Sequence, residues 1–261
     1  MSAAQPIGRP GLPPVHFSDL KRMAQSPLHY AYSLEHKRED TKALRLGRAV
    51  DALLFGTCGV VGFDGQRRGK EWAAFASANA GAICLNKTEH DLVLGMADSV
   101  ERHPEALELL GGERQKLIEW SLAGRDCAGT PDAFTAGRIT ELKTCRTAQP
   151  ERFPWDARRL GYHAQLAWYM EGLVQSGRAR PSTAHIVAVE SMAPHPVTVF
   201  VLTDRALDQG MRAWRLWFER LRACEESDAW PAYSESAVLF DVPEENEGFT
   251  LKIDGEETEV E

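Results

Sequence analysis

Apolar and polar positions along this chain follow two different periods, and the change between them outlines the fold. From residue 16 to about residue 110, apolar side chains recur every three or four positions, which is typical of amphipathic helices. From residue 116 onward, short apolar runs separated by glycine-containing turns favour β-strands. A helix, two more strands and a last helix follow. This succession predicts an α/β chain with a central mixed β-sheet flanked by helices.

Capping residues predict where several of these elements begin and end. Ser26 precedes Pro27, the pattern of an N-cap followed by the first helical residue. Asn86 stands three positions before Glu89, which is a capping box, and Gly56 closes another apolar repeat. We expect helices at 19–25 (capped by Ser18), 26–36, 41–56, 86–110, 158–175 and 205–226 (capped by Asp204), and strands at 116–123, 127–134, 138–144, 184–190 and 197–202.

Charge is distributed unevenly, and this divides the chain into three parts. The 261 residues carry a net charge of −8, but residues 241–261 hold nine acids and one lysine. The remaining 29 acids and 29 bases make residues 1–240 neutral, so a basic groove for nucleic acid is compatible with the composition. We expect an extended proline- and glycine-rich arm at 1–15, one domain at 16–240, and an acidic tail at 241–261 that is either a solvated end or a partner-docking or self-masking segment.

Cysteine usage and the start of the sequence bear on the compartment. The five cysteines form no CxxC pair, which argues against a zinc ribbon, an iron–sulfur cluster and a disulfide framework. The first residues lack the basic and apolar regions of a signal peptide, and no apolar run reaches the ~20 residues of a membrane span. The sequence therefore predicts a cytoplasmic location.

The residues that suggest chemistry lie within the strand-forming region. Glu141 and Lys143 are two apart in a predicted strand and so share a face, while Leu142 points to the other. If the two strands pair through the turn TAGR, Asp132 comes beside Glu141. Two carboxylates next to an ammonium stabilise a core poorly, but they suit Mg²⁺, which takes oxygen ligands and binds phosphate. Lys143 then orients or activates water, or stabilises charge on a phosphate. An exposed Glu–Lys pair on an edge strand is the alternative.

The following helix supplies a second group of polar residues. Tyr162, Gln165 and Tyr169 stand at helical spacing on one stripe. An aromatic stripe more commonly belongs to a core, yet a glutamine within it is unexpected there. Beside a metal site, Gln165 can hydrogen-bond the attacking water or a phosphate oxygen.

Together these motifs resemble the PD-(D/E)xK nuclease superfamily. The resemblance covers about residues 16–225 and rests on Pro131-Asp132, Glu141-Leu142-Lys143 and the Tyr162–Gln165–Tyr169 stripe. It is nearest to the RecB-like branch, and within it to the alkaline exonucleases of the lambda exonuclease and exonuclease VIII type. It implies a restriction-endonuclease-like core and degradation of linear duplex DNA from an end, 5′ to 3′, in phage-type recombination by single-strand annealing.

The resemblance also implies roles for individual residues. Asp132, Glu141, Lys143 and Gln165 would be catalytic; Asp132, Glu141, the Leu142 carbonyl and Asp51 would bind metal; Tyr162, Thr130 and Ser18 would contact DNA. It implies two Mg²⁺ ions per site, with Mn²⁺ as a substitute, a ring-shaped homotrimer and a single-strand annealing recombinase as partner, in a bacterial host or phage. A solvent-facing Asp51 is the alternative at that position, and Glu119 is a further carboxylate that we expect to be structural.

Three other functions remain open. An endonuclease or junction resolvase shares the same motif but would cut closed circular DNA or four-way junctions. A DNA-end-binding protein could retain the fold without catalysis, although the intact Asp132, Glu141 and Lys143 argue against it. A metal-dependent hydrolase of small molecules would leave the Tyr–Gln stripe unexplained.

Overall fold

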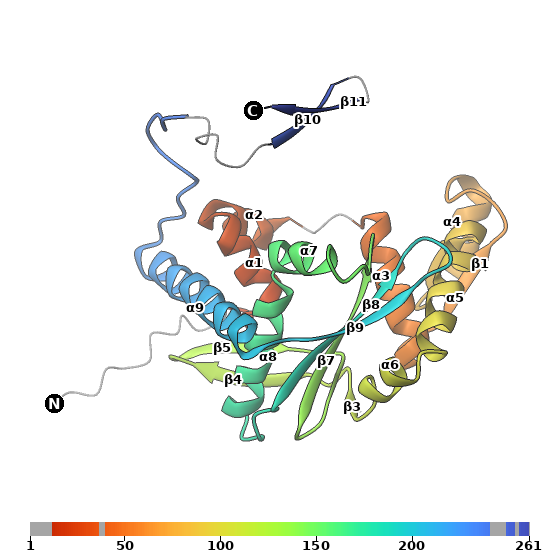
Figure 1. Cartoon of the computed structure of the whole chain (residues 1–261), viewed down its shortest axis with the longest axis horizontal. Coiled ribbons are helices and arrows are strands. Elements are labelled where there is room, and N and C mark those ends of the chain that lie inside the picture. The colour runs from red at the N-terminus through yellow and green to blue at the C-terminus, as the bar shows by residue number, and fades with distance from the viewer. Residues whose placement is uncertain (1–11, 37–39, 241–248, 254–255, 261) are drawn as a thin grey trace.

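The structure of the chain is a computed structural model that describes residues 12–36, 40–240, 249–253 and 256–260 (Figure 1). Up to strand β7 the elements are α1 (Phe17–Gln25), α2 (Pro27–Glu35), α3 (Lys42–Phe55), β1 (Val60–Phe63), α4 (Gly69–Ala78), β2 (Ile83–Asn86), α5 (Lys87–Glu101), α6 (Pro104–Leu109), β3 (Glu113–Arg114), β4 (Ile118–Leu122), β5 (Arg125–Gly129), β6 (Ala133–Phe134) and β7 (Arg138–Cys145). After it come α7 (Phe153–Leu160), α8 (Tyr162–Gln175), β8 (Thr183–Glu190), β9 (Val197–Val201), α9 (Asp204–Ser227), β10 (Phe249–Ile253) and β11 (Glu256–Val260).

A five-stranded mixed sheet in the order β3-β6-β7-β8-β9 forms the centre of the fold. Strands β7 and β8 are parallel, and the other neighbours in this sheet are antiparallel. The parallel pair requires a crossover connection, which helices α7 and α8 provide. Strands β4 and β5 form a separate antiparallel hairpin, and β1 and β2 form a parallel pair joined through α4. The predicted α/β class, with a central mixed sheet between helices, is confirmed.

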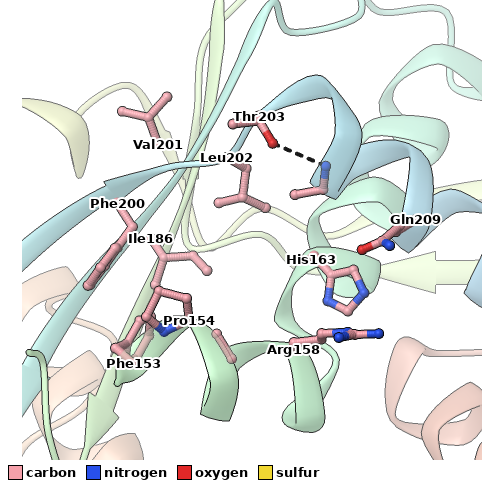
Figure 2. A pocket seen from close by; sticks show the side chains of 12 residues that line it. Phe153, Pro154, Arg158, His163, Ile186, Phe200, Val201, Leu202, Thr203 and Gln209 are labelled. Carbon is pink, nitrogen blue, oxygen red and sulfur yellow. Dashed lines mark hydrogen bonds between the residues drawn. The ribbon is translucent and has the colours of Figure 1, made fainter. Parts of the chain in front are cut away.

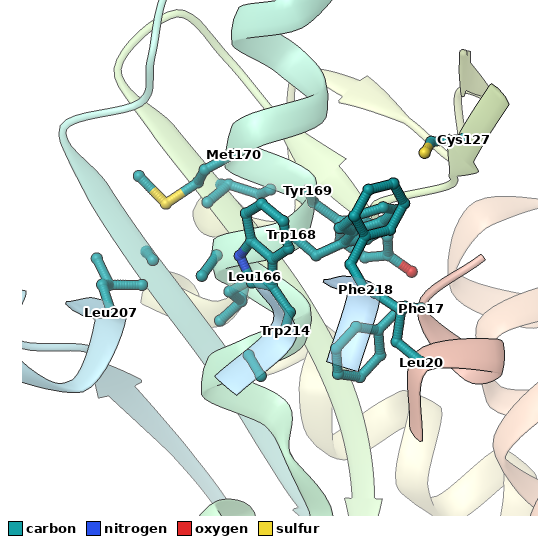
Figure 3. Close-up of a cluster of buried hydrophobic side chains, with 14 of the residues drawn as sticks. Phe17, Leu20, Cys127, Leu166, Trp168, Tyr169, Met170, Leu207, Trp214 and Phe218 are labelled. Atoms are coloured by element: carbon teal, nitrogen blue, oxygen red, sulfur yellow. The ribbon is translucent and has the colours of Figure 1, made fainter. Parts of the chain in front are cut away.

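Alternate residues of the sheet face two hydrophobic cores. On β8, Ala184, Ile186 and Ala188 belong to the core shared with α1, α8 and α9, whereas Val187 and Val189 belong to the core under α3 and α5. This alternation follows from the two-residue period of a strand. In the first core the rings of Trp168 and Trp214 meet edge to face, with their centroids 5.2 Å apart (Figure 3).

Several predicted helices begin or end at other residues. Helix α1 is capped by His16, with Asp19 completing a capping box, so the predicted Ser18 cap is wrong. Thr203 caps α9 through a hydrogen bond from Ala206 N, so the predicted Asp204 cap is wrong too. In both cases the helix begins one or two residues earlier than predicted; the Thr203 side chain accepts from the first turn of α9, and at α1 the His16 backbone N–H donates to Asp19. The Ser26 and Asn86 caps and the Gly56 helix end are confirmed.

Two predicted helices are each divided in two. Gly161, with φ of 75°, adopts the left-handed conformation and separates α7 from α8. His103 caps a new helix, α6, at Pro104, so the helix predicted over 86–110 ends at Glu101. Proline disfavours helical backbone in the residue before it, which explains the break.

The strand prediction is correct in position but incomplete. The segment predicted as one strand at 127–134 contains β5 and β6, separated by Thr130, Pro131 and Asp132. Strand β3 and the β1–α4–β2 unit were not predicted. In the acidic tail, the backbone of β10 and β11 pairs antiparallel, and residues 241–248, 254–255 and 261 lie outside the described residues. Of the predicted arm at 1–15, residues 1–11 also lie outside them, and Val15 bridges to Cys127.

All five cysteines are free thiols in the structure. Within the described residues, no helix is long and apolar enough to cross a membrane.

Candidate active site

The two predicted carboxylates meet because β6 and β7 pair as expected. Ala133 lies opposite Thr140 and Phe134 opposite Ile139, which brings Asp132 beside Glu141. The backbone N–H of Asp132 donates to Oε1 of Glu141 at 3.1 Å. Both side chains are buried, with exposed fractions of 8% and 2%. The predicted adjacency is thus confirmed, at a position that is largely shielded from solvent.

Each oxygen of the Asp132 carboxylate accepts a hydrogen bond. Oδ2 accepts from the backbone N–H of Leu142 at 2.7 Å, and Oδ1 accepts from Nε2 of Gln115 at 2.7 Å. Burial nevertheless raises the pKa of Asp132, because loss of water disfavours the charged form more than these donors favour it. Gln115, with φ of 47°, stands in a short loop before β4, and nothing in the sequence marked it as part of the site.

Lys143 joins the carboxylates to the open part of the site. Its Nζ donates to Oε2 of Glu141 at 2.7 Å and lies 5.2 Å from the ring centroid of Tyr162. The carboxylates of Glu141 and Asp132 raise the pKa of this lysine, although burial opposes the shift. Burial, followed by the charge of Asp132, raises the pKa of Glu141. The predicted common face of Glu141 and Lys143 is confirmed, and Leu142 points into the core under α3 and α5.

Asp51 approaches these groups from helix α3. A close contact between α3 and β7 positions it. A Cβ on Gly47 would lie 3.3 Å from Oγ1 of Thr144, so the Thr144 side chain packs against the helix where a side chain is absent. Burial, followed by the charge of Asp132, raises the pKa of Asp51 to about 8. The structure therefore does not support the alternative that Asp51 simply faces solvent.

Helix α8 provides the opposite wall. Gln165 Nε2 donates to Oη of Tyr169 at 3.0 Å, which fixes the amide and leaves its oxygen available as an acceptor. Tyr169 packs directly on β5, because a Cβ on Gly129 would lie 2.6 Å from its ring. Burial raises the pKa of both Tyr162 and Tyr169, so both hydroxyls stay protonated near neutral pH.

These elements enclose a pocket of about 630 Å³. The predicted site residues that line it are Ser18, Asp51, Thr130, Leu142, Lys143, Tyr162 and Gln165. Asp132 and Glu141 are not part of its lining; they lie behind Leu142 and Lys143, to which they are hydrogen-bonded. His16, Lys21 and Arg48 also line the pocket and were not predicted. Lysine and arginine in a pocket can mark phosphate contacts, but these residues come from two helices whose proximity the sequence did not indicate.

The donor set fits a hard divalent cation. Mg²⁺ is usually held by one or two carboxylates and retains several waters, and Asp132, Glu141 and the Leu142 carbonyl are oxygen donors of this kind. The carboxylates of Asp132 and Glu141 raise the pKa of Asp51, a repulsion that a cation would relieve. Across the described residues, no three His, Cys, Asp or Glu side chains are gathered tightly enough to hold a metal ion by themselves. Water would have to complete such a site.

A buried Asp-Glu-Lys set, with the Asp just before β6 and the Glu and Lys on the paired strand β7, beside a helix that carries Tyr and Gln, defines a nuclease of the PD-(D/E)xK class. Comparison with protein families agrees. Residues 16–242 match the model of a family described as "PDDEXK-like domain of unknown function (DUF3799)", and the chain belongs to this family. Comparison with curated proteins finds no match.

Two solved structures are similar to this chain. A candidate exonuclease from Eubacterium rectale has a TM-score of 0.66 and 17% sequence identity, with 92% of this chain and 90% of that chain covered. A phage-related exonuclease from Haemophilus somnus 129PT has a TM-score of 0.38 and 12% identity, with 83% and 96% covered. The first likeness shows a shared fold.

Proposed function

We propose that this nuclease is a divalent-metal-dependent exodeoxyribonuclease that degrades linear duplex DNA from an end. The observation that carries the proposal is the buried Asp132–Glu141–Lys143 set at the wall of a pocket of about 630 Å³. A pocket of that size suits the end of one strand better than an uninterrupted duplex. The name of the Eubacterium rectale protein supports the same activity.

The side chains divide the chemical work. A divalent ion at Asp132 and Glu141, with Asp51 as a further ligand, would supply an activated water and stabilise the leaving oxygen. Lys143 is held by Glu141 and donates its remaining protons toward the pocket, where a phosphate gains negative charge in the transition state. The oxygen of Gln165 orients the attacking water, and the Tyr162 hydroxyl, with Thr130 and Ser18, positions the phosphate backbone.

The family resemblance supports finer features of the same proposal. These are 5′-to-3′ polarity, Mg²⁺ as the natural ion with two ions per site, a role in phage-type recombination beside a single-strand annealing protein, and assembly as a ring-shaped trimer. Each of these features can be tested independently of the others.

Digestion of plasmid DNA tests the activity. Linear and covalently closed plasmid are incubated with Mg²⁺ or with EDTA, using the wild type and Lys143→Ala. We expect loss of linear DNA alone, only with Mg²⁺ and only by the wild type. Substrates labelled at the 5′ or the 3′ end, with 5′-phosphate or 5′-hydroxyl, then report polarity.

Other results would select the rival functions. Cleavage of the closed circle identifies an endonuclease, and preferential cutting of four-way junctions identifies a resolvase. Binding to DNA ends without cleavage under any metal condition identifies an end-binding protein and overturns the proposal.

A further inference from the structure

A second pocket, of about 270 Å³, lies away from the carboxylates at the junction of α7, β9 and the start of α9 (Figure 2). Its apolar part contains Phe153, Ile186, Phe200 and Leu202. The rings of Phe153 and Phe200 stack with centroids 4.6 Å apart, which gives this wall a fixed shape. The volume suits one or two apolar side chains better than a drug-sized ligand.

The polar groups of this pocket gather on one side. Arg158, His163 and Gln209 lie together, opposite the two phenylalanines (Figure 2). Arg158 is exposed and forms no ion pair with the described residues, and its charge lowers the pKa of His163, after the larger effect of burial. Nδ1 of His163 is buried without a hydrogen-bond partner in the described chain. The pocket therefore suits an occupant that is apolar at one end and acidic at the other.

The chain itself contains such a segment. Val238, Leu239 and Phe240 are 75%, 90% and 89% exposed, an unusual run of three large apolar side chains in water. Four acids follow within seven residues, in the sequence DVPEENE. The segment therefore has an apolar end and an acidic end, which complement the apolar wall and the arginine of the pocket.

The residues just before this segment are held at the C-terminal end of α9, whereas the pocket of the same chain lies at the N-terminal end of that helix. The Trp230 ring lies beside Tyr30, the Pro231 carbonyl accepts a hydrogen bond from Leu28 N, and the Tyr233 ring lies beside His29. Burial raises the pKa of Tyr30 to about 12, and the nearby charge of Glu225 adds to the shift, so the anchor lies at the C-terminal end of α9. From Gln209 in the pocket to Glu225 the helix runs about 24 Å. An extended chain from Tyr233 spans only about 20 Å to Leu239 and about 24 Å to Phe240, so Leu239 falls short of the pocket in its own chain.

We propose that residues 237–247 of one copy of this chain dock into the Phe153–Phe200 pocket of a second copy. Leu239 and Phe240 fill the pocket, and the acids after them pair with Arg158. Because the pocket and the segment are different surfaces, the contact is head-to-tail. Each copy can then bind a further copy, until the rotation between copies closes the assembly into a ring. This proposal does not depend on nuclease activity.

Photo-crosslinking identifies the occupant directly. Phe240→p-benzoylphenylalanine is made in the full chain, and equal amounts of ¹⁴N- and ¹⁵N-labelled protein are mixed before irradiation. We expect mixed-isotope crosslinks from position 240 to peptides that contain Phe153 or Phe200. Crosslinks within single chains only, or to other surfaces, would overturn the proposal in favour of an intramolecular or a nonspecific contact.

Sedimentation velocity across the micromolar range tests the energetic contribution. Leu239→Asp/Phe240→Asp and Arg158→Glu should each raise the concentration needed for association at least about tenfold. Leu107→Asp, which changes an equally apolar residue that is 54% exposed on α6, is the matched control and should have no effect. All four sites are exposed, so the melting temperatures should remain equal.

A charge swap distinguishes a specific ion pair between the tail acids and Arg158 from a general effect of net charge on association. Glu244→Lys/Glu245→Lys should weaken association by itself, and mixing that variant with Arg158→Glu should restore it. A wild type that stays monomeric at every concentration, or association that none of these changes weakens, contradicts the proposed docking.

Discussion

At the scale of single residues, the site is a set of acids that the protein buries at a cost. Asp132 and Glu141 accept four hydrogen bonds between them, and two of these come from backbone N–H groups that cannot move independently of the sheet. This fixes the carboxylates before any ligand arrives, which is how catalytic groups are preorganised. The elevated pKa of Asp51, Asp132 and Glu141 records the unfavourable electrostatic energy of that arrangement.

Lys143→Ala should lower the rate of DNA cleavage by roughly 10²–10³-fold, because it removes the donor placed beside the phosphate. Duplex binding, measured by fluorescence anisotropy, should change little. Glu119→Gln is the control: Glu119 is exposed on β4, outside the pocket, and its variant should retain wild-type activity. Equal loss in both variants would place the activity elsewhere.

Asp51 predicts how the stability of the metal-free protein depends on pH. Its folded-state pKa of about 8 is above the ~3.9 of an unfolded aspartate. The folded state therefore binds the proton more tightly, and stability should fall as pH rises from about 4 to about 8. In EDTA, Asp51→Asn should flatten this slope, with a melting temperature higher than that of the wild type by on the order of 10 °C at pH 8.5. Asp64→Asn, at an exposed position, should follow the wild type. Parallel slopes for all three proteins would show that Asp51 ionises freely.

At the scale of elements, short-range patterns were readable in the sequence and long-range contacts were not. The Asn86–Glu89 capping box and the Asp132–Glu141 adjacency depend on residues three and nine positions apart, and both are present. Gln115 reaches Asp132 across 17 positions through a loop, and no periodicity indicates such a contact. Strand β3 has two residues, too few to show alternation. Gly161 ends α7, and a glycine is a common helix end, but the apolar repeat continues on both sides of it, so the sequence pattern predicted one helix.

The position of the α8 wall depends on a close approach to β5. A methyl group at Gly129 would lie 2.6 Å from the Tyr169 ring, whereas one at Gly137 would meet nothing within 4 Å. Gly129→Ala should therefore lower the free energy of unfolding by about 1–3 kcal/mol through overpacking, and Gly137→Ala should be nearly neutral. Urea denaturation of the two variants measures this difference. Equal stability of the variants would mean that Tyr169 moves freely and does not fix the wall.

At the scale of the whole molecule, we expect the basic residues of the pocket and the acidic tail to have opposite effects on DNA binding. The pocket contains Lys21, Arg48 and Lys143, which attract phosphate, while the tail carries the entire excess of negative charge. Docking of residues 237–247 on a neighbouring copy would engage the first part of the tail. The acids nearer the end, in Glu256–Val260, would remain free to repel DNA.

Removing three of those distal acids should therefore strengthen DNA binding. Glu256→Gln/Glu257→Gln/Glu259→Gln removes three negative charges from the net charge of −8 and leaves the docking segment intact. Affinity for a short blunt duplex should rise several-fold at low salt. The difference should narrow as salt is added, because the Debye length falls from about 10 Å at 0.1 M to about 3 Å at 1 M. Replacing the same residues with aspartate keeps the charge and should leave the affinity unchanged. If the glutamine and aspartate variants bind alike at every salt concentration, the tail lies beyond the electrostatic reach of the DNA and its acids serve assembly alone.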